Sequence, residues 1–254
     1  MFSILSDFEG TLITDNGSIK ESDLFTLRDL IREGNHICIV SSASFDKLKE
    51  FKIKYSINID ILSIISGVAE VNGKIYQNKI PAFVLEKIYD EFHKFIYTAW
   101  ASDDENTYIY NFQERLDPLY PKANRVICDK FGIEVPAAII AIAKEKADQF
   151  HDFVNDIGIL VMPLGGDTNR SLFRIYRGSS SKADAYYLMK NVYNDTKTIG
   201  ATDSIVDLDM LKKCDIKIAM KNGDPEIKDA ADYVTEYDNN EGGLIKLLDN
   251  ICHL

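Results

Sequence analysis

Short apolar runs alternate along the start of the chain with segments in which apolar residues recur every three or four positions. Phe2 to Ser6 has the pattern of a buried strand, and an acid, Asp7, follows it directly. Apolar residues then recur at helical spacing from Leu24 to Ile31, and His36 to Val40 is a second strand that ends in Ser41-Ser42. A helical stretch from Phe45 to Phe51 comes after it. This strand–helix–strand order predicts crossover connections and a parallel sheet. We expect Ser22 or Asp23 to cap the first helix and Gly34 to end it.

The last third of the chain repeats this alternation. The pattern predicts helices at 182–193, 225–231 and 242–251, a further short helix before Asp215, and strands at 196–199, 215–219 and 233–234. In open parallel sheets the ligand lies beyond the carboxyl ends of the strands. Asp7, Ser41 and the Thr202-Asp203 region follow three predicted strands, so we expect these residues to converge at one edge.

The middle of the chain has a different pattern. We predict a long amphipathic helix at Phe83–Trp100, strands at 107–111, 138–143, 159–162 and 172–176, and a helix at 145–156. The whole pattern predicts an α/β protein with a doubly wound parallel sheet and an inserted α+β domain. Residues 1–80 and 179–254 form the Rossmann-like core in this interpretation, and residues 81–178 form the insertion. Pro81 and the Gly-Ser-rich stretch 178–181 are the expected hinges.

Composition excludes several classes of protein. The 254 residues are 46% hydrophobic and 27% charged, which is typical of a globular protein. A formal net charge of -11, from 29 basic and 40 acidic residues, argues against a nucleic-acid-binding surface. No apolar stretch reaches the ~18 residues of a membrane span, and the N-terminus lacks a signal-peptide pattern. The four cysteines have no metal-binding spacing. We therefore expect a cytoplasmic protein without a membrane or nucleic-acid partner.

Candidate chemistry begins with the two carboxylates of the segment Asp7-Phe8-Glu9-Gly10-Thr11. Close carboxylates repel each other, and a divalent cation relieves that repulsion. Ser41 adds a hydroxyl, and Lys182 adds a cation at the start of a predicted helix. Asp203 and Asp207 then place two more acids on one loop. The two carboxylates of this loop, near a third carboxylate, form the oxygen-rich site that magnesium prefers.

These motifs resemble those of the haloacid dehalogenase-like phosphohydrolases, in particular the Cof-type subgroup with an inserted α/β cap. The first family motif, Asp-x-Asp-Gly-Thr, is similar to Asp7–Thr11, and Ser41 stands at the second motif. Lys182 stands at the third motif. The fourth, Gly-Asp-Ser-x-Asn-Asp-x-x-Met, is similar to Thr202–Met210. The stretch from Ile218 to Thr235 also resembles the C-terminal part of the subgroup.

The chain departs from the family pattern at several supporting positions. Glu9 replaces the second Asp of the first motif. Thr202 and Val206 replace Gly and Asn of the fourth motif. After Ser41 the subgroup usually has Gly-Arg, whereas this chain has Ser42-Ala43. We therefore expect an activity that is reduced or redirected relative to the family.

The resemblance implies a role for each motif residue. Asp7 would be the nucleophile and Glu9 the general acid and base. Lys182, Ser41, Ser42 and the backbone near Gly10 would bind the phosphoryl group. The resemblance also implies a magnesium ion, with Asp7, the Glu9 carbonyl, Asp203 and Asp207 as its ligands.

Three functions follow from this interpretation. The first is a magnesium-dependent phosphatase that acts on a small phosphorylated metabolite, such as a sugar phosphate, through an aspartyl-phosphate. The second is a phosphomutase of the same superfamily, which Glu9 disfavours because that chemistry depends on the second acid. The third is a binding or regulatory protein that has kept the fold and lost turnover, with Glu9, Val206 and Ala43 in its favour.

Overall fold

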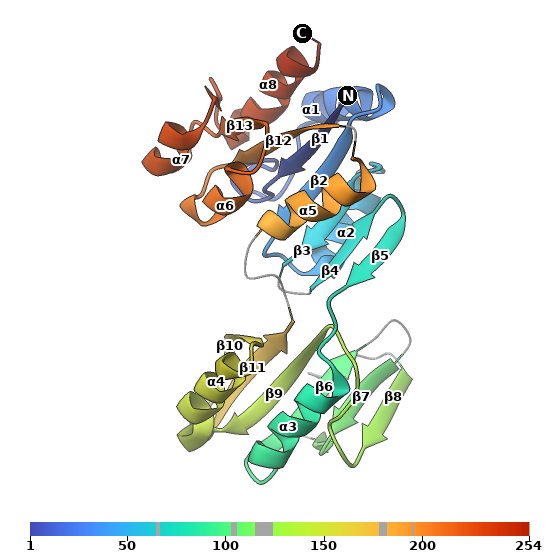
Figure 1. The fold of residues 1–254 in the computed structure, drawn as a ribbon, viewed down its shortest axis with the longest axis vertical. Helices are drawn as coiled ribbons and strands as arrows, with labels where there is room; N and C mark the ends of the chain where they lie inside the picture. The colour runs from blue at the N-terminus through green and yellow to red at the C-terminus, as the bar shows by residue number, and fades with distance from the viewer. Residues whose placement is uncertain (65–66, 103–105, 115–123, 178–181, 195, 254) are drawn as a thin grey trace. The chain divides into compact units, whose positions relative to one another are not determined.

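The computed structural model describes residues 1–64, 67–102, 106–114, 124–177, 182–194 and 196–253 (Figure 1). The chain divides into two compact units. One unit, which we call the core unit, comprises Met1–Tyr76 and Ser179–Leu254, and the other, the inserted unit, comprises Gln77–Gly178. The hinge expected at 178–181 lies outside the described residues.

The core unit is built on an eight-stranded sheet. Its strand order is β14-β13-β12-β1-β2-β3-β4-β5. The bounds of the strands are β1 Phe2–Ser6, β2 His36–Ser41, β3 Asp60–Ser63, β4 Val68–Val71, β5 Lys74–Gln77, β12 Lys197–Thr202, β13 Ile216–Ala219 and β14 Tyr233–Val234. The strands from β14 to β3 are parallel, and β4 pairs antiparallel with β3. The strand pattern found in the sequence did not include β3, β4 and β5.

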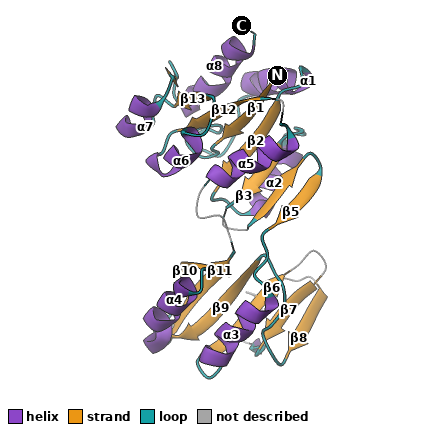
Figure 2. Ribbon diagram, viewed as in Figure 1, coloured by secondary structure: helices purple, strands orange, loops and turns teal. Residues whose placement is uncertain are grey.

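Helices cover both faces of this sheet (Figure 2). Leu27 and Leu48 are fully buried on one face, with Leu244 beside them, and Ala185 and Met189 are fully buried on the other. The helices that supply these residues are α1 (Glu21–Arg32), α2 (Phe45–Lys54) and α8 (Gly243–Cys252) on one face, and α5 (Ala183–Val192) on the other. The short helix α6 (Leu208–Leu211) packs on the same face as α5 through Met210. A further helix, α7 (Pro225–Ala230), packs through Ile227. The predicted α/β class with a doubly wound parallel sheet is confirmed.

The predicted cap of the first helix is wrong. The helix α1 begins at Glu21 with Lys20 at its N-cap position, and no side chain caps it. Ser22 and Asp23 lie inside the first turn, where the Ser22 hydroxyl donates to the Asp23 carboxylate. Gly34 follows the helix with φ +91° and donates its N–H to the Ile31 carbonyl, as a terminating glycine does.

The inserted unit has a six-stranded sheet of its own. The strand order is β10-β11-β9-β6-β7-β8, in which only β7 and β8 pair in parallel among the described strands. Phe92 and Phe150, on the helices of this unit, are buried with Ile140 in its core. The elements are α3 Ala82–Phe92, β6 Ile96–Ser102, β7 Asn106–Tyr110, β8 Asn124–Cys128, β9 Ala137–Ala143, α4 Ala147–Asp156, β10 Leu160–Gly166 and β11 Arg170–Tyr176.

The expected single helix at Phe83–Trp100 is wrong. It is divided into α3 and the strand β6, with a turn at 93–95 between them. Pairing with β9 on one side and β7 on the other determines the strand. A short apolar run suits a helix or a strand equally well, so these long-range pairings decide its structure.

Candidate active site

The nucleophile predicted by the sequence, Asp7, extends from the centre of the core sheet. The strand β1 lies between β12 and β2, and the Asp7 N–H donates to the Ala201 carbonyl at 2.9 Å, which continues the ladder one residue beyond the strand. The partner strands end at Ser41 and Thr202. Because these strands are parallel, their carboxyl ends bring Asp7, Ser41 and the loop after Thr202 to one edge of the sheet.

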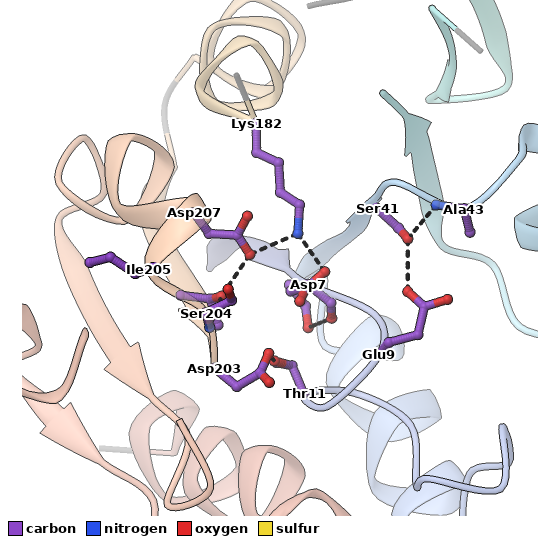
Figure 3. Close-up of polar contacts among 12 residues, drawn as sticks. Asp7, Glu9, Thr11, Ser41, Ala43, Lys182, Asp203, Ser204, Ile205 and Asp207 are labelled. Carbon is purple, nitrogen blue, oxygen red and sulfur yellow. Dashed lines mark hydrogen bonds and ion pairs between the residues drawn. The ribbon is translucent and has the colours of Figure 1, made fainter. Parts of the chain in front are cut away.

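Lys182 joins two carboxylates at this edge (Figure 3). It stands at the N-cap position of α5, and its Nζ lies 2.5 Å from Asp7 Oδ1 and 2.7 Å from Asp207 Oδ2. All three side chains are buried, with Lys182 8% and Asp207 1% exposed. Two carboxyl groups therefore share one ammonium away from water.

This charge balance explains the pKa values at the site. Burial raises the pKa of Asp7, the Lys182 ammonium opposes that effect, and the Asp207 charge adds to it, so the pKa is about 7. Burial disfavours the charged form of Lys182, but the carboxylates of Asp7 and Asp207 outweigh it and raise the pKa of the ammonium. Lys182 is therefore held as a cation at neutral pH.

Thr202 lies at this edge, as expected, and makes contacts that its place in the fourth motif did not indicate. Its hydroxyl donates to Asp207 Oδ2 at 2.7 Å and accepts the Ser204 N–H at 3.1 Å. The glycine of the family motif has no side chain to do this. Asp207 Oδ1 is buried and has no hydrogen-bond partner among the described residues. One carboxylate oxygen of Asp207 is therefore held and the other is open to a ligand.

Asp203 is held by the loop of the first motif. The Thr11 hydroxyl donates to Asp203 Oδ1 at 3.0 Å, and a Cβ at position 10 would collide with the Asp203 carboxylate. Gly10 also has φ +73°, a conformation that side-chain-bearing residues rarely adopt. Its carbonyl accepts the Asn222 side-chain amide at 2.8 Å. The glycine is thus required both for the turn and for the close approach of Asp203.

The donor atoms at this edge suit magnesium by chemistry. Asp7, Asp203 and Asp207 offer carboxylate oxygens, Glu9 offers a carbonyl, and the open Asp207 Oδ1 needs a partner. In the geometry shown, Lys182 bridges Asp7 and Asp207. Within the described part of the chain, no three His, Cys, Asp or Glu side chains are gathered closely enough to hold a metal ion.

Glu9 belongs to a second group at the same edge. Its Oε2 accepts the Ser41 hydroxyl at 3.0 Å and its Oε1 lies 2.8 Å from Lys47 Nζ, a residue that the motifs did not indicate. Burial by itself raises the pKa of Glu9, but the hydrogen bonds from Lys47 and Ser41 outweigh it and lower the pKa. Ser42, expected to bind phosphate, is exposed just after β2. The lysine is 38 positions from Glu9, so no local pattern could have revealed this pair.

Comparison with known proteins places the chain in a family. A family model described as haloacid dehalogenase-like hydrolase matches residues 4–248. The chain belongs to the haloacid dehalogenase-like hydrolases. The predicted Cof-type resemblance is confirmed, and so is the prediction of a phosphatase of this family.

Relatives of this hydrolase share its length and fold. It is 20% identical over 264 residues to the 5-amino-6-(5-phospho-D-ribitylamino)uracil phosphatase YitU of Bacillus subtilis, covering 97% of this chain and 96% of that protein. The crystal structure of TM0651 from Thermotoga maritima matches with TM-score 0.72 at 20% identity, covering 98% of this chain and 97% of the other. The phosphatase BT1666 from Bacteroides thetaiotaomicron matches with TM-score 0.62 at 19% identity, covering 100% and 96%.

None of the helices in the described ranges combines the length and the apolar character that crossing a bilayer requires.

Proposed function

We propose that this hydrolase is a magnesium-dependent phosphatase that acts on a small phosphorylated metabolite through an aspartyl-phosphate on Asp7. The observation that supports this most strongly is the buried Lys182, which lies within 2.7 Å of both Asp7 and Asp207. Because the Lys182 ammonium lies between Asp7 and Asp207, Asp7 can react with an anionic group while the ammonium keeps the charge at the site nearly balanced.

In the first step, Asp7 Oδ attacks phosphorus, and the bond from phosphorus to the leaving oxygen breaks. In the second step, water attacks the phosphorus of the aspartyl-phosphate, the Asp7–phosphorus bond breaks and inorganic phosphate leaves. Lys182 neutralises charge on the phosphoryl oxygens, and the Gly10 backbone with Ser41 orients them. Glu9 gives a proton to the leaving oxygen and takes one from the water.

Magnesium, when bound, would supply further neutralisation of the phosphoryl charge. Asp7, the Glu9 carbonyl, Asp203 and Asp207 would hold it, and the open Asp207 Oδ1 supports this assignment. Residues 77–178, which form the compact inserted unit, would act as the cap of the enzyme. The name of the relative YitU specifies a 5-phospho-D-ribitylamino compound, which supports a small phosphorylated metabolite as the substrate class.

The test is release of phosphate from p-nitrophenyl phosphate and from a panel of sugar phosphates, with magnesium and with EDTA. Asp7→Asn is expected to lower the rate by about 10⁴-fold or more, because the covalent route is lost. Asp60→Asn is the matched control, since Asp60 is also buried but lies at the other end of the core sheet. Equal rates for wild type and Asp7→Asn would contradict the mechanism. No release from any substrate would favour a binding protein.

A further inference from the structure

The hydroxyl of Ser41 is fully engaged inside the protein. Its oxygen accepts the Ala43 N–H at 2.9 Å, and its single proton is donated to Glu9 Oε2 at 3.0 Å. Ser41 is 0% exposed. A hydroxyl has only one proton to give, so in this arrangement none is left for a phosphoryl oxygen. Glu9 and the phosphoryl group therefore compete for the same donor.

Lys47 holds the other oxygen of Glu9. This lysine lies in the first turn of α2, and its Nζ is 2.8 Å from Glu9 Oε1 and 5.8 Å from the centre of the Phe8 ring. The two oxygens of one carboxylate are thus held by two elements, the end of β2 and the start of α2 (Figure 3 shows the contact with Ser41). Glu9 remains attached to Lys47 when Ser41 turns to another acceptor.

The contact between Glu9 and Lys47 includes one departure from the family pattern. Glu9 is one methylene longer than the usual aspartate, and its Oε1 is in direct contact with Lys47 Nζ. Ala43, where the subgroup has arginine, carries no charge, and Lys47 supplies a cation four residues beyond it.

We propose that Lys47 is a positioning residue for Glu9, a role that rests on the phosphatase function proposed above. A phosphoryl oxygen that takes the Ser41 proton displaces Glu9 from the hydroxyl, and Lys47 keeps the freed carboxylate at the edge of the site. Glu9, freed from Ser41, first takes up a proton from solvent, then gives it to the leaving oxygen and regains one from the attacking water, with no net proton change over the two steps.

The test compares Lys47→Met with Lys49→Met, an exposed lysine on the same helix. The substrates are ethyl phosphate, whose alkoxide leaving group needs a proton, and p-nitrophenyl phosphate, whose leaving group needs it much less. For ethyl phosphate, Lys47→Met is expected to lower kcat about two- to fivefold with KM unchanged, the range of a half-exposed ion pair. The effect on p-nitrophenyl phosphate is expected to be smaller, and Lys47→Arg restores the rate.

Repeating the Lys47→Met substitution in the Glu9→Gln variant distinguishes a positioning role of Lys47 from direct contact with the substrate. If Lys47 acts through Glu9, then Lys47→Met has no further effect in Glu9→Gln, because the partner is already neutral. An effect that persists in Glu9→Gln, or a rise in KM, would show that Lys47 touches the substrate itself and would overturn the proposal. A Lys47→Met enzyme identical to Lys49→Met would overturn it as well.

Crystal structures of the wild type and of Lys47→Met give a readout that needs no turnover. With inorganic phosphate bound at Ser41, Glu9 is expected to leave the edge of the site in Lys47→Met and to stay there in Lys49→Met. An unmoved Glu9 in Lys47→Met would refute the positioning role even in an active enzyme. Absence of phosphate release by the wild type would instead refute the proposed phosphatase, and the crystal structures would still decide the role of Lys47.

Discussion

Two buried aspartates of the core sheet, Asp7 and Asp60, are stabilised in different ways. Asp7 follows the carboxyl end of β1 and lies 2.5 Å from the Lys182 ammonium, which Asp207 shares. Asp60 begins β3 at the amino end, where it accepts the Tyr193 hydroxyl at 3.0 Å and the Asn72 N–H at 2.8 Å. Burial raises the pKa of both carboxyl groups.

The difference shows that one sheet can bury two carboxyl groups for different purposes. Neutral donors satisfy Asp60 completely, with one hydrogen bond for each oxygen, and the His36 ring stacks on Tyr193 at 3.6 Å between centroids. At the other end, two carboxylates share one ammonium, and an Asp207 oxygen has no partner among the described residues. Under the proposed function, the incomplete pairing would allow a phosphoryl group to interact there, whereas the pairing at Asp60 would serve structure.

The largest effect is expected from removing the shared cation. Lys182→Met leaves Asp7 and Asp207 buried without their charge partner and is expected to lower the free energy of unfolding by about 3–5 kcal/mol at pH 7. Urea denaturation measures this change, and Lys213→Met, at an exposed lysine, serves as the control with a change within about 0.5 kcal/mol. Equal stabilities of the two variants would mean that the ion pairs of Lys182 with Asp7 and Asp207 contribute nothing to the free energy of unfolding.

A smaller loss is expected at the amino end of the sheet. Tyr193→Phe keeps the ring that stacks on His36 and removes the hydroxyl that donates to Asp60. One oxygen of a buried carboxylate then loses its donor, which costs about 1–3 kcal/mol in the free energy of unfolding. Tyr187→Phe, at an exposed tyrosine of α5, the helix that Tyr193 directly follows, should stay within about 0.5 kcal/mol. Phosphatase activity is expected to survive both changes.

The smallest expected effect is a dependence of the free energy of unfolding on pH. The pKa of Asp60 is raised above its ordinary value of 3.8, chiefly by burial, while the Asn72 N–H, Tyr193, Lys52 and His36 oppose the shift. The folded state therefore binds the Asp60 proton more tightly than the unfolded chain. This contribution to stability is complete below pH 3.8 and is lost as pH rises through the raised pKa.

Asp60→Asn removes that titration. The free energy of unfolding of the wild type, minus that of Asp60→Asn, is expected to fall between pH 3.5 and pH 7. Denaturation curves at several pH values give this difference directly, and the change should be smaller than that of Tyr193→Phe at pH 7. A difference that stays constant or rises with pH would mean that burial does not disfavour the Asp60 charge.

The sequence by itself determined the local parts of the molecule. The strands β1 and β2 and the helix α2 follow from short apolar runs and helical spacing within a few residues. The motif residues Asp7, Ser41 and Lys182 could be found because each follows a strand or begins a helix in the order that the family uses. The resemblance to the family could be recognised from the sequence because it depends on these short motifs, all of which can be found in one chain.

Tertiary structure decided what depends on distant partners. The strand β6 is a strand because β7 and β9 pair with it, although its sequence also fits a helix. Lys47 meets Glu9 across 38 positions, and Thr202 reaches Asp207 only through the turn of its loop. The energy of such a contact arises from the fold that brings the two groups together, and neither residue carries a local signal of it.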